Sequence, residues 1–223
     1  PKTHSPWACR RCAKSSSGSD SLGTSAPFAS PLAEELADDV LERFLRYVRV
    51  DTQAAQRVER RPSTEKQLEL SRMLIDELHE LGLSDATLTD SATVFASLPG
   101  TIEAPVVGLI AHVDTTPDVT GANVAPVVHE AWAGGRIELP GDSRQVLDPE
   151  QLPELAKRAG HDIVTSDGTT LLGADDKAGI AEIMAAVAHL AERPARPRAP
   201  IRVAFTVDEE VGRGAEDFDL EEF

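Results

Sequence analysis

Short apolar runs alternate along this chain with segments whose apolar residues recur at helical spacing. The clearest run is 106–111, which His112 follows at once, and a second run, 201–207, leads directly into Asp208. Between them, segment 180–190 has apolar side chains at positions 180, 183, 184 and 187, the spacing of a helix that packs on a sheet. Strands that alternate with helices predict an α/β fold with ligands bound at the carboxyl ends of strands.

The same patterns predict the other elements of the fold. Run 106–111 is apolar throughout, which is typical of a strand covered on both sides, so we expect a mixed, mostly parallel sheet with helices on both faces. One helix is predicted after Pro31, and a second after residues 62–64, where Thr64 and Gln67 have the spacing of a capping box. The second helix is expected to end at Gly82 and to bury a stripe of Leu70, Met73, Leu74, Leu78 and Leu81. We also expect β-rich stretches at 87–88 and 94–98 and a short helix within 150–158. The remainder of 115–160 is rich in glycine, proline and polar residues.

Composition narrows the class of protein. The chain has 223 residues, of which 41% are hydrophobic and 27% charged, as in globular proteins. Its longest apolar runs are too short to span a bilayer. The 22 Lys and Arg residues against 38 Asp and Glu residues give a net charge of −16, which argues against nucleic acid or an anionic membrane as the main partner. A soluble enzyme, or a site that gathers cations, fits this balance.

The first 30 residues differ from the rest of the chain. They are basic and contain a serine-rich run at 15–19 without apolar periodicity, so we expect a disordered or spurious N-terminal extension, with a transit-like leader as the alternative. Cys9 and Cys12 have the spacing of metal ligands, but a structural zinc site needs four ligands, so none is expected there. With no further cysteine, a disulfide framework is excluded, and we expect a reducing, cytoplasmic location.

Three polar clusters stand at the ends of apolar elements. His112 and Asp114 are two residues apart, so on an extended backbone they point to one face. Asp175 and Asp176 follow a glycine turn before a helix, and acidic residues occupy 208–210 at a strand end. Taken singly, these are a strand-end histidine, a helix cap and a solvated acidic loop, and capping is an equal alternative for Asp176. Together they favour a site that holds cations.

The flanks of the three clusters resemble the peptidase T family, the tripeptide aminopeptidase branch of the dinuclear zinc exopeptidases. The resemblance runs from about residue 41 to the last residue, and Val207 departs from it because the family more often has proline there. The segments that carry it are 51–53 (DTQ), 62–65 (PSTE), 111–118 (AHVDTTPD), 172–180 (LGADDKAGI) and 205–215 (FTVDEEVGRGA).

The resemblance implies a role for each residue of the clusters. His112 would be a ligand of one metal ion, and Asp114 would hold and polarise that histidine. Asp175 would bridge two divalent ions, and Glu210 would be a ligand of the second ion. Glu209 would be the general base that takes a proton from the bridging water. The ions are expected to be Zn²⁺, with Co²⁺ or Mn²⁺ as alternatives.

The resemblance also implies a substrate and an incomplete site. The expected activity is release of the N-terminal residue from short peptides, chiefly tripeptides. Each ion lacks one protein ligand, and the family supplies an aspartate and a histidine from positions beyond 223. We therefore expect 31–223 to be the N-terminal part of a catalytic domain, without the family's lid and dimerisation domain and inactive alone. A homodimer is expected only for a full-length form.

Two other interpretations stay open at this point. One is a related dinuclear-zinc aminoacylase or dipeptidase with the same metal site. The other is a fragment that binds metal without catalysis. The residues that bind the substrate are not indicated by the sequence.

Overall fold

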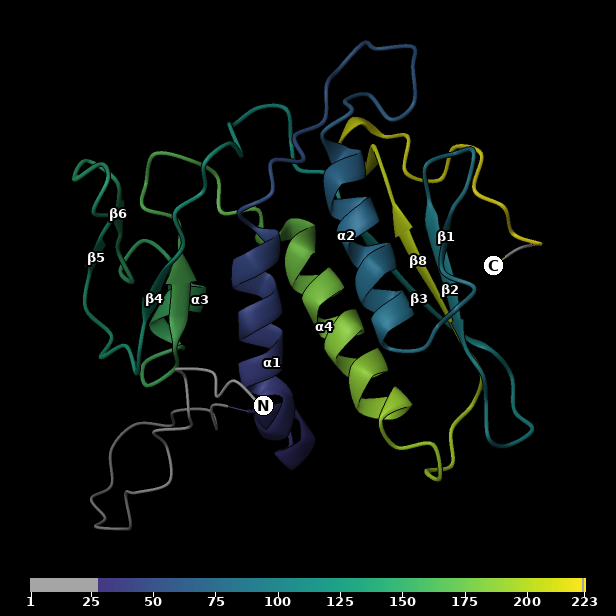
Figure 1. Cartoon of the computed structure of the whole chain (residues 1–223). Helices are drawn as coiled ribbons and strands as arrows, with labels where there is room; N and C mark the ends of the chain where they lie inside the picture. Colours follow the sequence, from purple (N-terminus) through teal and green to yellow (C-terminus); the bar gives the residue numbers. More distant parts are fainter. Residues whose placement is uncertain (1–27, 222) are drawn as a thin grey trace, which may run out of the picture.

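Three long helices and a four-stranded sheet form the centre of the computed structural model, which describes residues 28–221 and residue 223 (Figure 1). The helices are α1 (Pro31–Tyr47), α2 (Gln67–Glu80) and α4 (Ala174–Ala191). The strands of the central sheet are β1 (Thr87–Leu88), β2 (Val94–Leu98), β3 (Val107–His112) and β8 (Ile201–Thr206). Most of the expected N-terminal extension, including Cys9 and Cys12, lies outside the described residues. Within the described part of that extension, the side chain of Ser30 caps α1 by accepting from the Ala33 N–H.

The strand order is β1-β2-β8-β3, and the predicted mixed sheet is confirmed. β3 runs parallel to β8, whereas β2 is antiparallel to both β8 and β1. One of the three pairings is thus parallel, where a mostly parallel sheet was expected. The reason lies in the connections: a tight turn at 89–93 joins β1 to β2 and enforces an antiparallel pair, while the long crossover that contains α4 allows β3 and β8 to run parallel.

The core fills the space between the sheet and the helices, with α4 packed on β3, α2 packed on β1 and β2, and α1 packed on α4 (Figure 1). Fully buried side chains in this core come from all layers: Leu70, Leu74, Val94, Ala96, Ile180, Met184, Val203 and Phe205. The predicted apolar faces of α2 and α4 supply the helical share, and Gly82, with φ of 89°, ends α2 as expected.

The opposite face of the sheet differs from the expectation. Phe95 and Ile110 both flank Ala204 in the register, so they share this face. The rings of Phe218 and Phe223 pack against Phe95, but Ile110 is 55% exposed. Among the described residues no helix covers this face, so helices on both faces are not found. An apolar run shows that a strand contains apolar residues, but not whether both of its faces are covered.

An insert of short strands lies beside α1 (Figure 1). In it β4 (Val127–His129) pairs with β7 (Ile163–Thr165), and β5 (Ile137–Glu138) pairs with β6 (Val146–Leu147). The predicted short helix is present as α3 (Pro153–Ala156). Trp132, Ile137 and Leu139 form a small core of its own. The strands were not predicted, because they lie in a segment rich in glycine, proline and polar residues that shows no apolar pattern.

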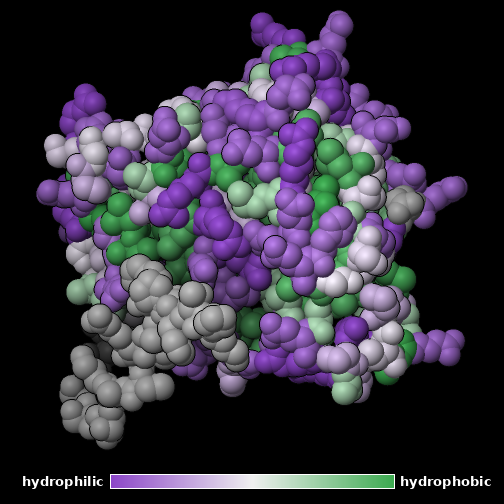
Figure 2. Space-filling view, in the orientation of Figure 1, coloured by the Kyte–Doolittle hydropathy of each residue, from purple (hydrophilic) through white to green (hydrophobic). Residues whose placement is uncertain are grey.

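The outward face of α2 is hydrophilic (Figure 2). Its exposed residues are Glu69, Arg72, Asp76, His79 and Glu80, opposite the buried stripe of Leu70, Leu74 and Leu78. A helix with one apolar and one charged face packs on a core and meets water. None of the helices in the described part of the chain is long and apolar enough to cross a membrane.

Candidate metal centre

His112 is the last residue of β3, and its ring is buried. The ring atom Nδ1 lies 3.0 Å from the main-chain oxygen of Asp114 and 3.4 Å from its carboxylate. The other ring nitrogen, Nε2, lies 3.1 Å from Oδ1 of Asp175. The strand end and the residue two positions on therefore fix the ring, and Nε2 is directed at the second predicted cluster.

Asp175 stands at the start of α4, after Gly173 in the left-handed conformation with φ of 78°. Its own backbone is non-helical, with φ −87° and ψ 108°, and its side chain is 86% exposed. The carboxylate of the next residue, Asp176, lies near Gly179 in the first turn of α4. The capping interpretation of Asp176 stays a prediction. Asp175 is left with its carboxylate free to face His112.

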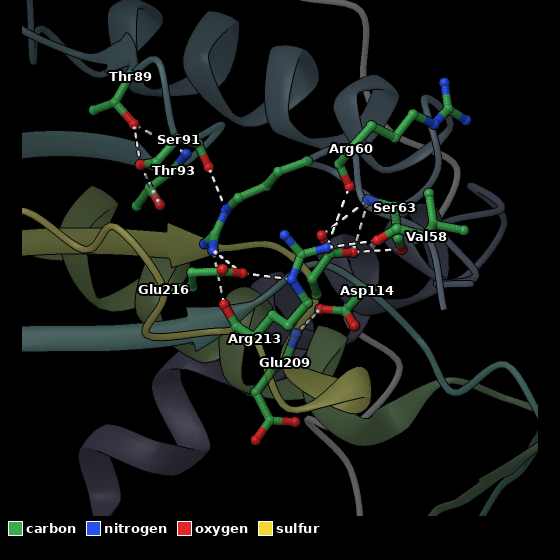
Figure 3. Close-up of polar contacts among 12 residues, drawn as sticks. Val58, Arg60, Ser63, Thr89, Ser91, Thr93, Asp114, Glu209, Arg213 and Glu216 are labelled. Atoms are coloured by element: carbon green, nitrogen blue, oxygen red, sulfur yellow. Dashed lines mark hydrogen bonds and ion pairs between the residues drawn. The ribbon is translucent and has the colours of Figure 1, made fainter. Parts of the chain in front are cut away.

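Glu209 and Glu210 open a 3₁₀ turn, Glu209–Val211, directly after β8. Asp208 makes the bend between them with a left-handed φ of 62°. Asp114 accepts hydrogen bonds from the N–H groups of Glu209 and Glu210, each at 3.0 Å, and Figure 3 shows its carboxylate facing the main chain of Glu209. Asp114 thus holds both the histidine and the glutamate pair.

The ends of three elements bring the predicted ligands together. Because β3 and β8 are parallel, with His112 opposite Thr206, the His112 and Glu209–Glu210 clusters share one edge of the sheet. One candidate ligand atom from each of His112, Asp175 and Glu210 lies within 4.8 Å of the others. Glu209 lies beside them, with Oε2 at 3.7 Å from His112 Nε2.

The electrostatics of the cluster favour positive charge. Burial lowers the pKa of His112, but the hydrogen bond and charge of Asp114, with Asp176 and Asp175, outweigh it and raise that pKa to about 9. Burial also raises the pKa of Glu210, as do the negative charges of Asp175, Asp114 and Glu209, against the opposing effect of His112. One imidazole and two carboxylates that converge in a negative environment form a donor set that suits zinc, cobalt or manganese.

Known proteins match most of this chain. The model of peptidase family M20/M25/M40 matches residues 163–219. Peptidase T of Bacillus cereus is 48% identical over 190 residues, which are 84% of this chain and 46% of that protein. Over most of its length the chain is similar to peptidase T. The resemblance seen in the sequence is therefore confirmed, and the chain spans about half the length of the curated relatives it matches.

Solved structures show the same fold. The aminopeptidase PepT of Bacillus cereus superposes with a TM-score of 0.58 and 24% sequence identity, covering 83% of this chain and 40% of that one. A tripeptidase from Staphylococcus aureus gives the same score, identity and coverage. These matches confirm the α/β fold.

Some residues around the centre had no role predicted from the similarity to peptidase T. Lys177 is almost fully buried, which lowers its pKa to about 8, and its Nζ donates to the main-chain oxygen of Val50 at 2.7 Å. Lys177 lies one helical turn before Ile180 and Ala181, on the buried face of α4. This helical spacing is the sequence feature that could have predicted its burial. Lys177 joins the start of α4 to the loop that follows α1.

Asp208, Ser63 and Gln67 form a second buried group next to the glutamate pair. Asp208 was predicted as one of three acids at a strand end. Ser63 and Gln67 were seen only as part of a helix start. In the structure α2 begins at Gln67, and the Thr64 hydroxyl donates to the main-chain oxygen of Gln53 instead of capping the helix. The predicted capping box is therefore wrong.

Proposed function

We propose that residues 31–223 form part of the catalytic domain of a metal-dependent aminopeptidase that releases the N-terminal residue of tripeptides. The observation that carries this proposal is the convergence of His112, Asp175 and Glu210 in a relative of peptidase T. The names of two solved structures with this fold, an aminopeptidase and a tripeptidase, agree with it.

His112 would hold one divalent ion, Glu210 a second, and Asp175 both. The donor set and the negative environment of the cluster support this assignment. We propose Zn²⁺ as the resident ion, with Co²⁺ or Mn²⁺ as alternatives that the same ligands accept. Two such ions, when bound, lower the pKa of a water and polarise the scissile carbonyl.

Glu209 is the group that moves the proton in this proposal. Its carboxylate is 56% exposed and lies beside the ligand atoms, while Asp114 accepts a hydrogen bond from its main chain. From this position Glu209 would accept the proton of the attacking water and return it to the leaving amine. Asp114 would keep the His112 ring oriented throughout.

The rest of the site is proposed to come from segments outside the described residues. Within those residues each ion would have one terminal protein ligand, His112 or Glu210, and would share Asp175, whereas zinc sites usually have about four ligands. The aspartate, the histidine, the lid and the dimerisation domain expected from the family would supply what is lacking. A homodimer is then proposed for the full-length form. Short peptides are the proposed substrates and the cytoplasm the proposed location.

The test is peptide hydrolysis by the protein at its natural length. The protein is stripped of metal, reloaded with Zn²⁺, Co²⁺ or Mn²⁺, and given a tripeptide, a dipeptide and an N-acyl amino acid. We expect metal-dependent release of the N-terminal residue, fastest from the tripeptide, and none from Glu209→Gln. Preference for the dipeptide or the N-acyl amino acid would replace this proposal with the dipeptidase or aminoacylase alternative. Metal binding without hydrolysis would leave a non-catalytic metal-binding protein.

A further inference from the structure

Asp208 is a fully buried carboxylate whose direct hydrogen bonds within the described residues come from uncharged donors. The Ser63 N–H donates to both of its oxygens, at 3.0 and 2.9 Å, and the Ser63 hydroxyl donates to Oδ1. The Gln67 amide donates to the same Oδ1 at 2.7 Å. A buried carboxylate needs such donors, because desolvation without them is strongly unfavourable.

Gln67 binds residue 208 twice. Besides the bond to the Asp208 carboxylate, its Oε1 accepts from the Asp208 N–H at 3.1 Å. One side-chain amide therefore fixes both the main chain and the side chain of the residue that precedes Glu209. That residue has a left-handed φ of 62°, a conformation that is uncommon for residues other than glycine, although aspartate adopts it more readily than most.

The loop before α2 and the turn after β8 are also joined by two arginines. Arg61 donates to the main-chain oxygen of Arg213, and Arg213 donates to the main-chain oxygens of Val58 and Arg60. Figure 3 shows Arg213 lying among Val58, Arg60 and Glu216. The segment from Val58 to Gln67 thus contacts both ends of the turn that carries the glutamate pair.

We propose that Gln67 and Ser63 are positioning residues for Glu209 and Glu210, acting through their hydrogen bonds to Asp208. The inference rests on the proposed function, since the glutamates must act on metal and water for their position to matter. Asp114 holds the N–H groups of the pair from one side, and Gln67 with Ser63 holds the preceding residue from the other. The direction of both glutamate side chains then depends on two buried anchors.

A reciprocal exchange tests this role. In Gln67→Glu a donor is lost and a second buried carboxylate faces Asp208. In Asp208→Asn an amide replaces the carboxylate, so the amide donor of Gln67 faces a second amide donor. The double variant restores the pairing, because the new side-chain amide and the main-chain N–H at position 208 both donate to the carboxylate at position 67. Glu65→Gln is the matched control, since Glu65 lies between Ser63 and Gln67 but is exposed and pairs with Arg60 at the surface.

The measurements use the natural-length protein loaded with Co²⁺, whose absorption spectrum reports the ligand geometry. We expect Gln67→Glu to lower Co²⁺ affinity and kcat by about 10–100-fold and to change the spectrum, as supporting residues around metal ligands do. The double variant should recover the wild-type spectrum and most of the affinity, and Glu65→Gln should match the wild type throughout.

Two results would overturn the positioning role. One is a Gln67→Glu protein that is less stable to heat but has the wild-type spectrum, affinity and kcat in its folded fraction. The other is a double variant that stays as impaired or as unfolded as Gln67→Glu. A wild-type protein that binds no Co²⁺ would instead refute the proposed metal site, and the positioning role with it.

Discussion

Asp114 accepts a hydrogen bond from the main-chain N–H of Glu209 at 3.0 Å, although 95 residues separate them in the chain. The second oxygen of Asp114 accepts from Glu210, and the same carboxylate lies 3.4 Å from the His112 ring. One fully buried side chain therefore fixes the strand-end histidine and the glutamate turn relative to one another.

Asp114→Asn should weaken the fold. An asparagine offers one acceptor oxygen, so one of the two glutamate N–H groups would face an amide donor inside the protein. The free energy of unfolding should fall by about 1–3 kcal/mol, the effect of leaving a buried polar group unpaired. Urea denaturation in the presence of a chelator measures this. The exposed neighbour Asp118→Asn is the control and should change stability by less than about 0.5 kcal/mol. An equal loss in both variants would contradict the role of Asp114.

His112 should keep its proton to unusually high pH in the metal-free protein. Burial lowers its pKa, but Asp114, Asp176 and Asp175 raise it to about 9. Because this folded-state pKa exceeds the unfolded value of about 6.5, protonation of His112 stabilises the fold, and the full effect is present below about pH 6.5. This stabilisation is lost as the pH rises towards 9. Imidazole NMR signals, assigned with His112→Ala in the presence of a chelator, should titrate near pH 9 and move to lower pH in Asp114→Asn. A wild-type midpoint near 6.5 would contradict the prediction.

Substitutions of Glu209 and Asp175 should separate the loss of catalysis from the loss of metal binding. At natural length, Glu209→Gln should keep its metal and lose turnover, because an amide cannot accept the proton of water. Asp175→Ala should lose both, since it removes a ligand from each ion. Metal content by atomic emission and hydrolysis of a tripeptide measure the two effects. Full activity of Glu209→Gln would remove Glu209 from the mechanism.

Local patterns in the sequence were enough to predict the elements that carry the centre. The patterns predict strand ends at 111 and 207 and a helix start near 176. In the structure β3 ends at His112, β8 ends at Thr206 and α4 begins at Ala174, so the three clusters lie at the ends of elements. Their convergence follows from the parallel pairing of β3 with β8. The helical repeat of Leu70, Leu74 and Leu78 likewise predicted the buried stripe of α2.

Contacts between distant segments were beyond such patterns. Gln67 and Asp208 are 141 residues apart, and nothing in either local sequence indicates that they pair. The sequence pattern around Gln67 suggested a capping box, whereas tertiary contacts direct its side chain to Asp208. The face of β3 that carries Ile110 shows the same limit, since apolar composition does not reveal what covers a strand.

The contact between α1 and α2 should depend on Tyr47. Its ring is fully buried, and its hydroxyl donates to Glu77 at 2.7 Å. Burial raises the pKa of Tyr47, so it remains a neutral donor. Tyr47→Phe should lower the free energy of unfolding by about 1 kcal/mol, because Arg43 and Arg46 still pair with Glu77. Glu77→Ala should lower it by about 1.5–3 kcal/mol, since three partners lose their acceptor. Urea denaturation of both variants checks the order, and a larger loss in Tyr47→Phe would contradict it.

The 223-residue chain by itself should not hydrolyse tripeptides at a meaningful rate. Among the described residues His112 and Glu210 would each give one ion a single terminal ligand, with Asp175 shared, so we expect weak binding and low occupancy. Glu216 is not placed to complete the set, because its carboxylate accepts from Arg213 and lies 3.7 Å from Arg61. Supplied with excess Zn²⁺ or Co²⁺, the purified chain should release no more amino acid than His112→Ala. Turnover clearly above that control would mean that another acid of the turn, such as Asp217, completes the site.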